Sequence, residues 1–402
     1  MLPLPHWLRR ADPGATALIL PQRRLSYREV RELTPRAGLC VPEGAPDGAA
    51  GDAALALLAA GLGGGTVFPL PPGMDDGQRR RLLALAEAAA TPRLALIVAT
   101  SGSEGAPKGV RLPWRAVAAA ARMSARALDL KPGDVWLACL PLFHVGGAMI
   151  PYRCWRAGAT ALVHEGFDAE AVLRDLRDQR VSHISLVPPM LAKLLDAGVA
   201  PPLTLRHALV GGAALAEPLL DRARAAGWPI RTSWGMTETC ATATLDGRPL
   251  PGVRVRVAAA GTLDVASPAR MAGYLGQGNA DEWLPTRDLG TIDADGCVRV
   301  TGRADDMLIS AGINIHPADV ESRLAACPGI REAGVAGVAD PVWGDIVAAV
   351  YEGEAGEATV EAWCRAHLPR AQRPRRFLRV AGLPRTASGK LDRRGLLAMI
   401  QP

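Results

Sequence analysis

Lysine is scarce in this sequence, and no stretch is dominated by charge of one sign. Lysine occurs four times, at Lys108, Lys131, Lys193 and Lys390, whereas arginine supplies the other basic residues. The 46 basic and 40 acidic residues leave a net charge of +6 without a basic block, so charge by itself does not indicate a nucleic-acid partner. A lysine retained among so many arginines suggests a need for a compact charge on a flexible stem, and two of the four fall in motifs.

Paired cysteines, a secretory leader and a membrane span are also missing. The seven cysteines are dispersed and odd in number, without C-x-x-C spacing, so we expect small buried residues in a reducing compartment. The N-terminal residues lack a basic region followed by an apolar core, and no signal peptide is expected. The uncharged stretch 53–70 contains Gly63, Gly64, Gly65 and Pro69, which favours a buried helix, a turn and a short strand over a membrane span. A cytoplasmic location is expected.

The order of apolar runs indicates an α/β fold. Hydrophobic residues make up 49% and charged residues 21%, as in ordinary globular proteins, and 402 residues suffice for two or three domains. Strand-like apolar runs occupy residues 94–99, 135–140, 184–187 and 207–210. Helical patterns occupy residues 114–128, 169–179 and 218–226. This alternation predicts parallel sheets covered by helices.

The pattern changes after residue 250. Strand-like runs at 253–257, 261–265 and 297–301, with a turn signal at 293–296, predict a β-rich subdomain over about 250–302. The last hundred residues predict an α+β unit. In it, His316 would cap a helix that has Pro317 at its first position, and strands are expected at 334–338, 346–351 and 377–380.

Two motifs with hydroxyls and glycines follow strand-like runs. In Thr100-Ser-Gly-Ser-Glu-Gly-Ala-Pro-Lys-Gly109, hydroxyls, backbone N–H groups and Lys108 can surround phosphate oxygens, although this is not a Walker A loop. In Ser233-Trp-Gly-Met-Thr-Glu-Thr239, the ring can stack on a base, Thr237 can bond a phosphate and Glu238 can hold Mg²⁺. Taken singly, a plain glycine/serine turn and a capped helix start stay open as alternatives.

Three further segments carry candidate residues. Asp288 and Arg303 would grip the hydroxyls of a ribose if they converge, but such residues are more often surface charges. Lys390 ends Pro384-Arg-Thr-Ala-Ser-Gly-Lys390, where it can swing into a site or belong to a mobile polar tail. His144, in Pro141-Leu-Phe-His-Val-Gly-Gly147, is either functional or a core histidine.

Together and in this order, the segments resemble the adenylate-forming superfamily of acyl- and aryl-CoA synthetases, luciferases and peptide-synthetase adenylation domains. The resemblance extends from Leu25 to Lys390 and includes Thr301-Gly-Arg-Ala-Asp-Asp306 and Ser310-Ala-Gly-Ile-Asn314. Within the superfamily, residues 140–147, 183–191 and 234–240 look like the o-succinylbenzoate–CoA ligase family of menaquinone biosynthesis. Residues 302–310 and 314–317 look equally like halobenzoate–CoA ligases.

The resemblance implies an architecture and a reaction. A large N-terminal domain would occupy residues 1–304, and a small swinging C-terminal domain would occupy 305–402. A carboxylic acid would react with ATP to give acyl-AMP and pyrophosphate, and the acyl group would pass to CoA with release of AMP. The implied partners are the acid, ATP, Mg²⁺ and coenzyme A, without a tightly bound organic cofactor, nucleic acid or membrane span. The oligomeric state is open, with a homodimer as one option.

The resemblance also implies residue roles. The catalytic residues would be Lys390, Thr237, Glu238 and His144, with Glu238 as the metal ligand. Nucleotide binding would involve the phosphate loop, the adenine-binding segments and a ribose pair, namely Thr100, Ser101, Gly102, Ser103, Lys108, Gly211, Gly212, Ala213, Trp234, Gly235, Met236, Thr237, Asp288 and Arg303. The acid and CoA would meet His144, Gly235 and Gly312, and Asp305 would be the hinge.

Some features depart from the family pattern and leave alternatives open. The region before Thr100 is short, Glu104 adds a charge to the phosphate loop, and Ile313 stands where many members have Glu. Alternatives to the o-succinylbenzoate ligase are a benzoate-type aryl-CoA ligase, a stand-alone adenylation enzyme loading a carrier-protein thiol, and a binding or scaffold protein without catalysis. Arg153, Arg156 and His183 are each candidates to meet a second carboxylate of the acid, or are structural.

Overall fold

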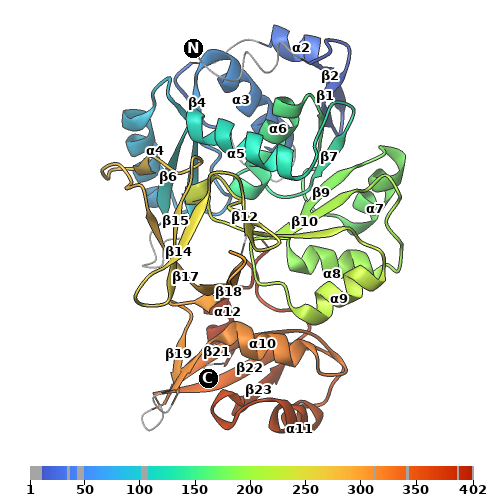
Figure 1. Cartoon of the computed structure of the whole chain (residues 1–402), viewed down its shortest axis with the longest axis vertical. Coiled ribbons are helices and arrows are strands. Elements are labelled where there is room, and N and C mark those ends of the chain that lie inside the picture. The colour runs from blue at the N-terminus through green and yellow to red at the C-terminus, as the bar shows by residue number, and fades with distance from the viewer. Residues whose placement is uncertain are drawn as a thin grey trace. The chain divides into compact units, whose positions relative to one another are not determined.

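The computed structural model describes residues 11–33, 37–42, 49–100, 107–310, 313–340, 344–386 and 389–400 (Figure 1). The chain forms two compact units. The first comprises residues 1–212, 226–255 and 265–284, and the second comprises 213–225, 256–264 and 285–402. Both combine sheets and helices, and the predicted α/β class is confirmed.

The first unit contains a nine-stranded sheet with the order β13-β12-β11-β10-β9-β7-β8-β1-β2. Its parallel centre consists of β11 (Ile230–Trp234), β10 (His207–Gly211), β9 (His183–Leu186), β7 (Val135–Ala138), β8 (Thr160–Val163) and β1 (Thr16–Leu20). Antiparallel strands flank it: β12 (Thr244–Leu245), β13 (Arg248–Pro249) and β2 (Arg23–Ser26). The central strands are apolar because both faces are buried, as the sequence predicted.

Helices accompany these strands, including the two predicted at residues 114–128 and 169–179. They are α2 (Tyr27–Glu32), α5 (Trp114–Ala127), α6 (Val145–Ala157), α7 (Ala169–Asp178) and α8 (Pro188–Asp196). Helix α7 is capped by Asp168, whose side chain accepts the backbone N–H of Ala171 at 2.7 Å, and α8 begins with Pro188 at its first position. Local sequence signals therefore set where these helices start.

A second sheet of the first unit has the order β16-β6-β5-β4-β3. Its strands are β16 (Gly273–Tyr274), β6 (Lys108–Pro113), β5 (Leu94–Thr100), β4 (Thr66–Val67) and β3 (Leu39–Cys40), accompanied by α3 (Ala49–Gly63) and α4 (Asp76–Ala89). The predicted helix, turn and strand over 53–70 are confirmed by α3 and β4. Among the described residues, no helix is both long and apolar enough to cross a membrane.

A third sheet has the order β14-β15-β17-β18, from Arg254–Val257, Thr262–Ala266, Leu284–Ile292 and Val298–Arg303. The predicted hairpin turn joins β17 to β18. Asp293 Oδ1 accepts the backbone N–H groups of Asp295 and Cys297 at 3.1 and 2.8 Å, and Gly296 adopts φ +76°. In this turn the aspartate supplies the acceptor and the glycine supplies the left-handed backbone.

The rest of the second unit is a sheet of β20 (Ile313–Ile315), β19 (Leu308–Ser310), β22 (Gly344–Gly353) and β21 (Ile330–Asp340), with β23 (Arg376–Arg379) parallel to β22. Its helices are α9 (Glu217–Ala225), α10 (Pro317–Ala325), α11 (Glu357–His367) and α12 (Arg393–Ile400). Pro317 starts α10 as predicted. The predicted cap is wrong in one respect, because the His316 side chain makes no capping hydrogen bond.

Candidate active site

Three predicted segments lie at one edge of the large sheet. His144 follows β7. Gly211 is the last residue of β10 and Gly212 follows it, and Trp234 is the last residue of β11. These strands run parallel in the order β11-β10-β9-β7, so their carboxyl ends share one edge. Ligands of open α/β sheets bind at such an edge. The first unit thus gathers these residues at a plausible ligand position, whereas Ala213 belongs to the second unit.

The segment after β11 is a tight turn that only glycine permits. A Cβ on Gly235 would lie 1.7 Å from the carbonyl oxygen of Ala241. The chain closes on itself here, since the N–H of Ala241 donates to Met236 O at 3.1 Å and the N–H of Ala243 donates to Trp234 O at 2.8 Å. Thr237 and Glu238 stand in the single 3₁₀ turn between these bonds. The close backbone approach therefore places the two residues predicted to meet phosphate and metal.

A tyrosine outside the sequence motifs contacts Glu238. The Tyr274 hydroxyl donates to Glu238 Oε1 at 2.8 Å, and the N–H of Met271 donates to the Glu238 carbonyl at 2.7 Å. Lys108 Nζ lies 5.8 Å from the centre of the Tyr274 ring. Burial raises the pKa of Tyr274, and the neighbouring Glu238 charge raises it further, so the hydroxyl keeps its proton and stays a donor.

Tyr274 was missed because its position depends on a distant strand. In β16, Tyr274 pairs with Val110 of β6, next to Lys108 at the start of that strand. The only local signal is the Gly273-Tyr274 dipeptide in a chain with four tyrosines. A two-residue strand has no periodicity from which pairing can be predicted.

An antiparallel ladder flanks the segment that is predicted to bind phosphate. Thr100 ends β5 and pairs with Lys108, which begins β6. Ser101, Gly102 and Ser103 lie outside the described residues. Thr100 and Lys108 are thus adjacent across the hairpin, with Lys108 on the side of Tyr274.

A buried arginine lies beside the Trp234 turn. Arg153 is 1% exposed, and its Nη2 donates to Thr242 Oγ1 at 3.2 Å; Ser233 Oγ donates to the same oxygen at 3.2 Å. Its guanidinium lies 5.2 Å from the centre of the Trp136 ring, and its Nε has no hydrogen-bond partner among the described residues. Burial lowers the pKa of Arg153 to about 10, so the side chain stays charged at neutral pH.

His183, the other buried candidate, is committed to the fold. One ring nitrogen lies 2.8 Å from Leu128 O and the other 2.8 Å from Ser182 Oγ, and the ring stacks on Trp136 at 5.1 Å. Burial lowers the pKa of His183 to about 4, so the ring is neutral at physiological pH. A neutral ring with both nitrogens occupied has no donor left for a carboxylate, so Arg153 is a better candidate than His183.

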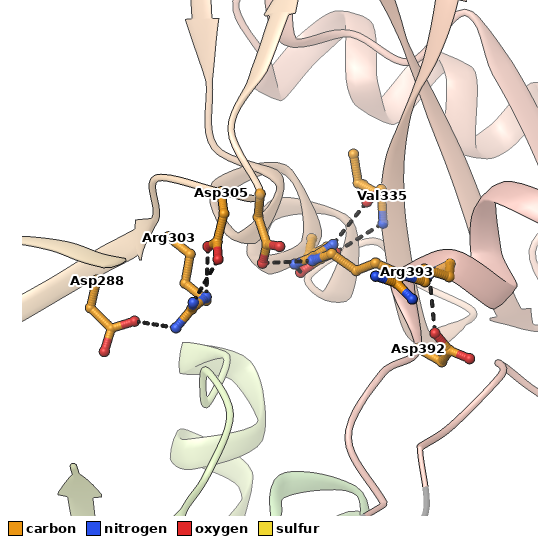
Figure 2. A network of polar contacts seen from close by, with 9 residues as sticks. Asp288, Arg303, Asp305, Val335, Asp392 and Arg393 are labelled. Atoms are coloured by element: carbon orange, nitrogen blue, oxygen red, sulfur yellow. Dashed lines mark hydrogen bonds and ion pairs between the residues drawn. The ribbon is translucent and has the colours of Figure 1, made fainter. Parts of the chain in front are cut away.

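In the second unit, Arg303 joins two carboxylates (Figure 2). Its Nη1 lies 2.9 Å from Asp288 Oδ1, and its Nε and Nη2 contact the two oxygens of Asp305 at 2.9 and 2.8 Å. Residues 288 and 303 are paired in the β17–β18 hairpin, which explains why they converge. The two side chains thus meet the condition of converging, whereas the ribose role stays a prediction.

Lys390 stands in a turn of the second unit. We call the described residues 386 and 389–391 the Lys390 turn. Arg385 and Leu391 form an antiparallel bridge, and the Thr386 N–H donates to Lys390 O at 2.9 Å. Gly312, the predicted CoA contact, lies outside the described residues. The structure thus shows one set of candidates within the first unit and another within the second.

Comparison with known proteins agrees with these motifs. Residues 74–275 match the AMP-binding enzyme family, and residues 319–390 match the AMP-binding enzyme C-terminal domain. A 2-succinylbenzoate–CoA ligase from Bacillus licheniformis is 37% identical over 331 residues, which cover 75% of this chain and 69% of that protein.

Solved structures are similar over nearly the whole chain. The o-succinylbenzoate CoA synthetase from Bacillus subtilis, in complex with the acyl-adenylate intermediate OSB-AMP, has a TM-score of 0.84 and 27% identity, with 97% of each chain covered. The same synthetase with ATP and magnesium ion has a TM-score of 0.79 and 26% identity, with 96% of this chain and 98% of that chain covered.

Proposed function

This chain belongs to the AMP-binding enzyme family and is an ATP-dependent, AMP-forming CoA ligase, and from that premise we propose that its acid is o-succinylbenzoate, activated in menaquinone biosynthesis. The reaction uses ATP, Mg²⁺ and CoA. A homodimer and a cytoplasmic location stay predictions from the sequence, and light scattering of the purified protein would test the first.

The first half-reaction joins a carboxylate to the α-phosphorus of ATP. A carboxylate oxygen forms the new O–P bond, the bond to the β-phosphate breaks, and pyrophosphate leaves. The acid is already ionised at pH 7, so no general base is needed. The obstacle is repulsion between an anion and a polyphosphate, and Lys108, Thr237 and Lys390 are the proposed groups that reduce it.

Glu238 suits the predicted metal role. Its Oε1 accepts the Tyr274 hydroxyl, and no protein donor among the described residues reaches its Oε2. In nucleotide sites Mg²⁺ is bound by one or two carboxylates together with the phosphates, and Glu238 has one carboxylate oxygen available for this. When bound with ATP, Mg²⁺ would neutralise charge on the phosphates.

The second half-reaction passes the acyl group to the CoA thiol. Sulfur forms a bond to the acyl carbonyl carbon, the bond from that carbon to the phosphate oxygen breaks, and AMP leaves with its electron pair. The thiol proton goes to solvent. We propose that Trp234 stacks on adenine, that Asp288 and Arg303 hold the ribose, and that His144 lies between the acid and the thiol.

The observation that carries the choice of acid is Arg153. o-Succinylbenzoate has two carboxylates, of which one reacts and the other must be accommodated. A charged guanidinium that is 1% exposed and has no carboxylate partner among the described residues is costly, and an anion beside it would offset that cost. Thr242 links Arg153 to Ser233, the residue before Trp234, because its hydroxyl oxygen accepts a hydrogen bond from each of them. A simple benzoate would leave this charge uncompensated, which ranks the benzoate ligase second.

A set of four acids tests the proposal. Initial rates with ATP and CoA would be compared for o-succinylbenzoate, for 4-oxo-4-phenylbutanoate and 2-butanoylbenzoate, which each lack one of its carboxylates, and for benzoate. We expect the diacid to have the highest kcat/KM, with a loss of about 10- to 100-fold when the non-reacting carboxylate is removed.

The variant Arg153→Met should remove most of that preference, whereas Arg156→Met, in the same helix, should keep it. Equal rates for the diacid and a monoacid in the wild type would overturn the substrate assignment. A preference for the diacid that survives Arg153→Met would place the second carboxylate elsewhere.

A further inference from the structure

Two consecutive aspartates at the predicted hinge engage different arginines. Asp305 pairs with Arg303 through both carboxylate oxygens, at 2.9 and 2.8 Å. Asp306 Oδ2 accepts Arg393 Nε at 2.9 Å. Figure 2 shows Arg303 between Asp288 and Asp305, whereas Arg393 contacts Val335 on the side of Asp305 that faces away from Arg303. The two aspartates at the predicted hinge are therefore each held by an ion pair with a different arginine.

The anchor on the Arg393 side is a closed set of contacts. Arg393 Nη1 donates to Glu321 Oε1 at 2.7 Å and to the Val335 carbonyl at 2.9 Å, and its Nη2 lies 3.3 Å from Glu321 Oε2. The Val335 N–H donates back to Glu321 Oε1 at 2.9 Å. We call these contacts, together with Asp306, the Arg393 bridge. It joins the start of α12 to α10, β21 and the residue after the hinge.

Arg393 is also close in sequence to Lys390. The Asp392 N–H donates to Pro384 O at 2.9 Å, so the Lys390 turn is closed immediately before Arg393. On its other flank, Arg385 forms an ion pair with Glu332 of β21. Both flanks of the turn are thus tied to the sheet by an arginine, but of these two arginines only Arg393 contacts the residue after the hinge.

We propose that Arg393 is a positioning residue that transmits rotation at Asp305 to the Lys390 turn. This rests on the proposed function, in which Lys390 reaches the reacting phosphate during adenylation. With the bridge intact, Asp306 and the Lys390 turn move as one rigid part. Without the bridge, Lys390 still moves with the C-terminal residues, but the hinge no longer fixes the position of its ammonium group. An error of about 1 Å in such a contact slows a reaction by roughly 100-fold.

The test measures the two half-reactions separately in the full chain. Adenylation is followed by ATP–pyrophosphate exchange, and thiol transfer is followed by thioester formation from supplied acyl-adenylate and CoA. The variants are Arg393→Met and Asp306→Asn; the second keeps the Glu321 contacts and removes only the charged contact beside the hinge. Arg394→Met is the matched control, because Arg394 is the next residue of α12 and its side chain has no ion pair among the described residues.

We expect Arg393→Met to slow adenylation by about 10- to 100-fold and Asp306→Asn by a smaller factor, with thiol transfer changed less than adenylation in both. In the Lys390→Ala background neither substitution should slow adenylation further, because both act through Lys390. Arg393→Lys should restore part of the rate.

Several results would overturn the proposal: full adenylation by Asp306→Asn, equal losses in the two half-reactions, or an Arg393→Met effect that multiplies with Lys390→Ala. If Arg393→Met does not fold, Asp306→Asn decides. Failure of the wild type to activate o-succinylbenzoate would count against the proposed acid. The role of Arg393 is judged separately, from the adenylation rate of the variant relative to that of the wild type with any acid that the wild type activates.

Discussion

At the scale of single residues, the polar contacts of Glu238 and Arg153 carry the chemistry, and neither could be located fully from the sequence. Glu238 was predicted as a metal ligand from its motif, but the Tyr274 hydroxyl on it comes from a strand 36 residues away in sequence. Arg153 was one of three candidates for a second carboxylate. Its burial, and the absence of a carboxylate partner for it among the described residues, depend on packing that no local sequence pattern encodes.

Tyr274→Phe should raise the Mg²⁺ concentration needed for adenylation by about tenfold, because the hydroxyl that fixes the Glu238 carboxylate is lost while the ring remains. A Mg²⁺ titration of ATP–pyrophosphate exchange measures this. Tyr27→Phe is the control, since Tyr27 also loses a buried hydroxyl, one that donates to Ala159 O at 2.7 Å, away from the motifs. An unchanged Mg²⁺ requirement in Tyr274→Phe would show that Glu238 does not depend on this contact.

His183 should make the protein less stable as the pH falls from 6.5 to about 4. The ring is neutral in the folded protein because burial lowers its pKa to about 4, whereas the unfolded chain binds a proton near pH 6.5. The unfolded state therefore takes up more protons in this interval, and folding loses about 3 kcal/mol on the way down. Above pH 6.5 the contribution is complete.

Denaturant unfolding of wild type and His183→Gln across this range would measure the effect. His207, whose pKa burial also lowers, keeps part of the slope in the variant. Identical slopes in the two proteins would mean that His183 is not the titrating group.

At the scale of elements, the sequence predicted those whose signals are local. Pro317 begins its helix as expected, and the Asp293 turn forms as its composition indicates. Of the two-residue strands, β4 lies in a predicted strand, but β16 was not predicted, because it is defined only by a distant partner. His316 shows the limit of local signals, since it stands at the right position but makes no cap.

Gly235→Ala should open the turn that places Thr237 and Glu238. Its Cβ would lie 1.7 Å from Ala241 O, and this backbone oxygen cannot move without breaking the turn. We expect adenylation to fall by about 100-fold or more. Gly166→Ala is the matched control, because its Cβ meets nothing within 4 Å. Comparable exchange rates for both variants would show that the turn tolerates the added methyl group.

At the scale of the whole molecule, the sequence predicted an α/β chain whose last hundred residues form a separate α+β part. The second unit of the structure contains that part, together with residues 213–225, 256–264 and 285–302. Segments so distant in sequence join a unit through tertiary packing, which local patterns do not encode. A boundary at residue 305 stays a prediction, and it is best tested by the movement that it would permit.

Asp305→Pro should slow thiol transfer more than adenylation, because proline fixes the φ angle at the predicted hinge. The substitution also removes the two contacts with Arg303. Asp305→Ala removes the same contacts but leaves the backbone free, so the difference between the two variants isolates the backbone. The measurement is the ratio of the thioester rate from supplied acyl-adenylate to the ATP–pyrophosphate exchange rate. A ratio well below wild type in Asp305→Pro and near wild type in Asp305→Ala is expected, because only a blocked rotation separates the half-reactions. If both variants share one ratio, the movement does not pivot at residue 305.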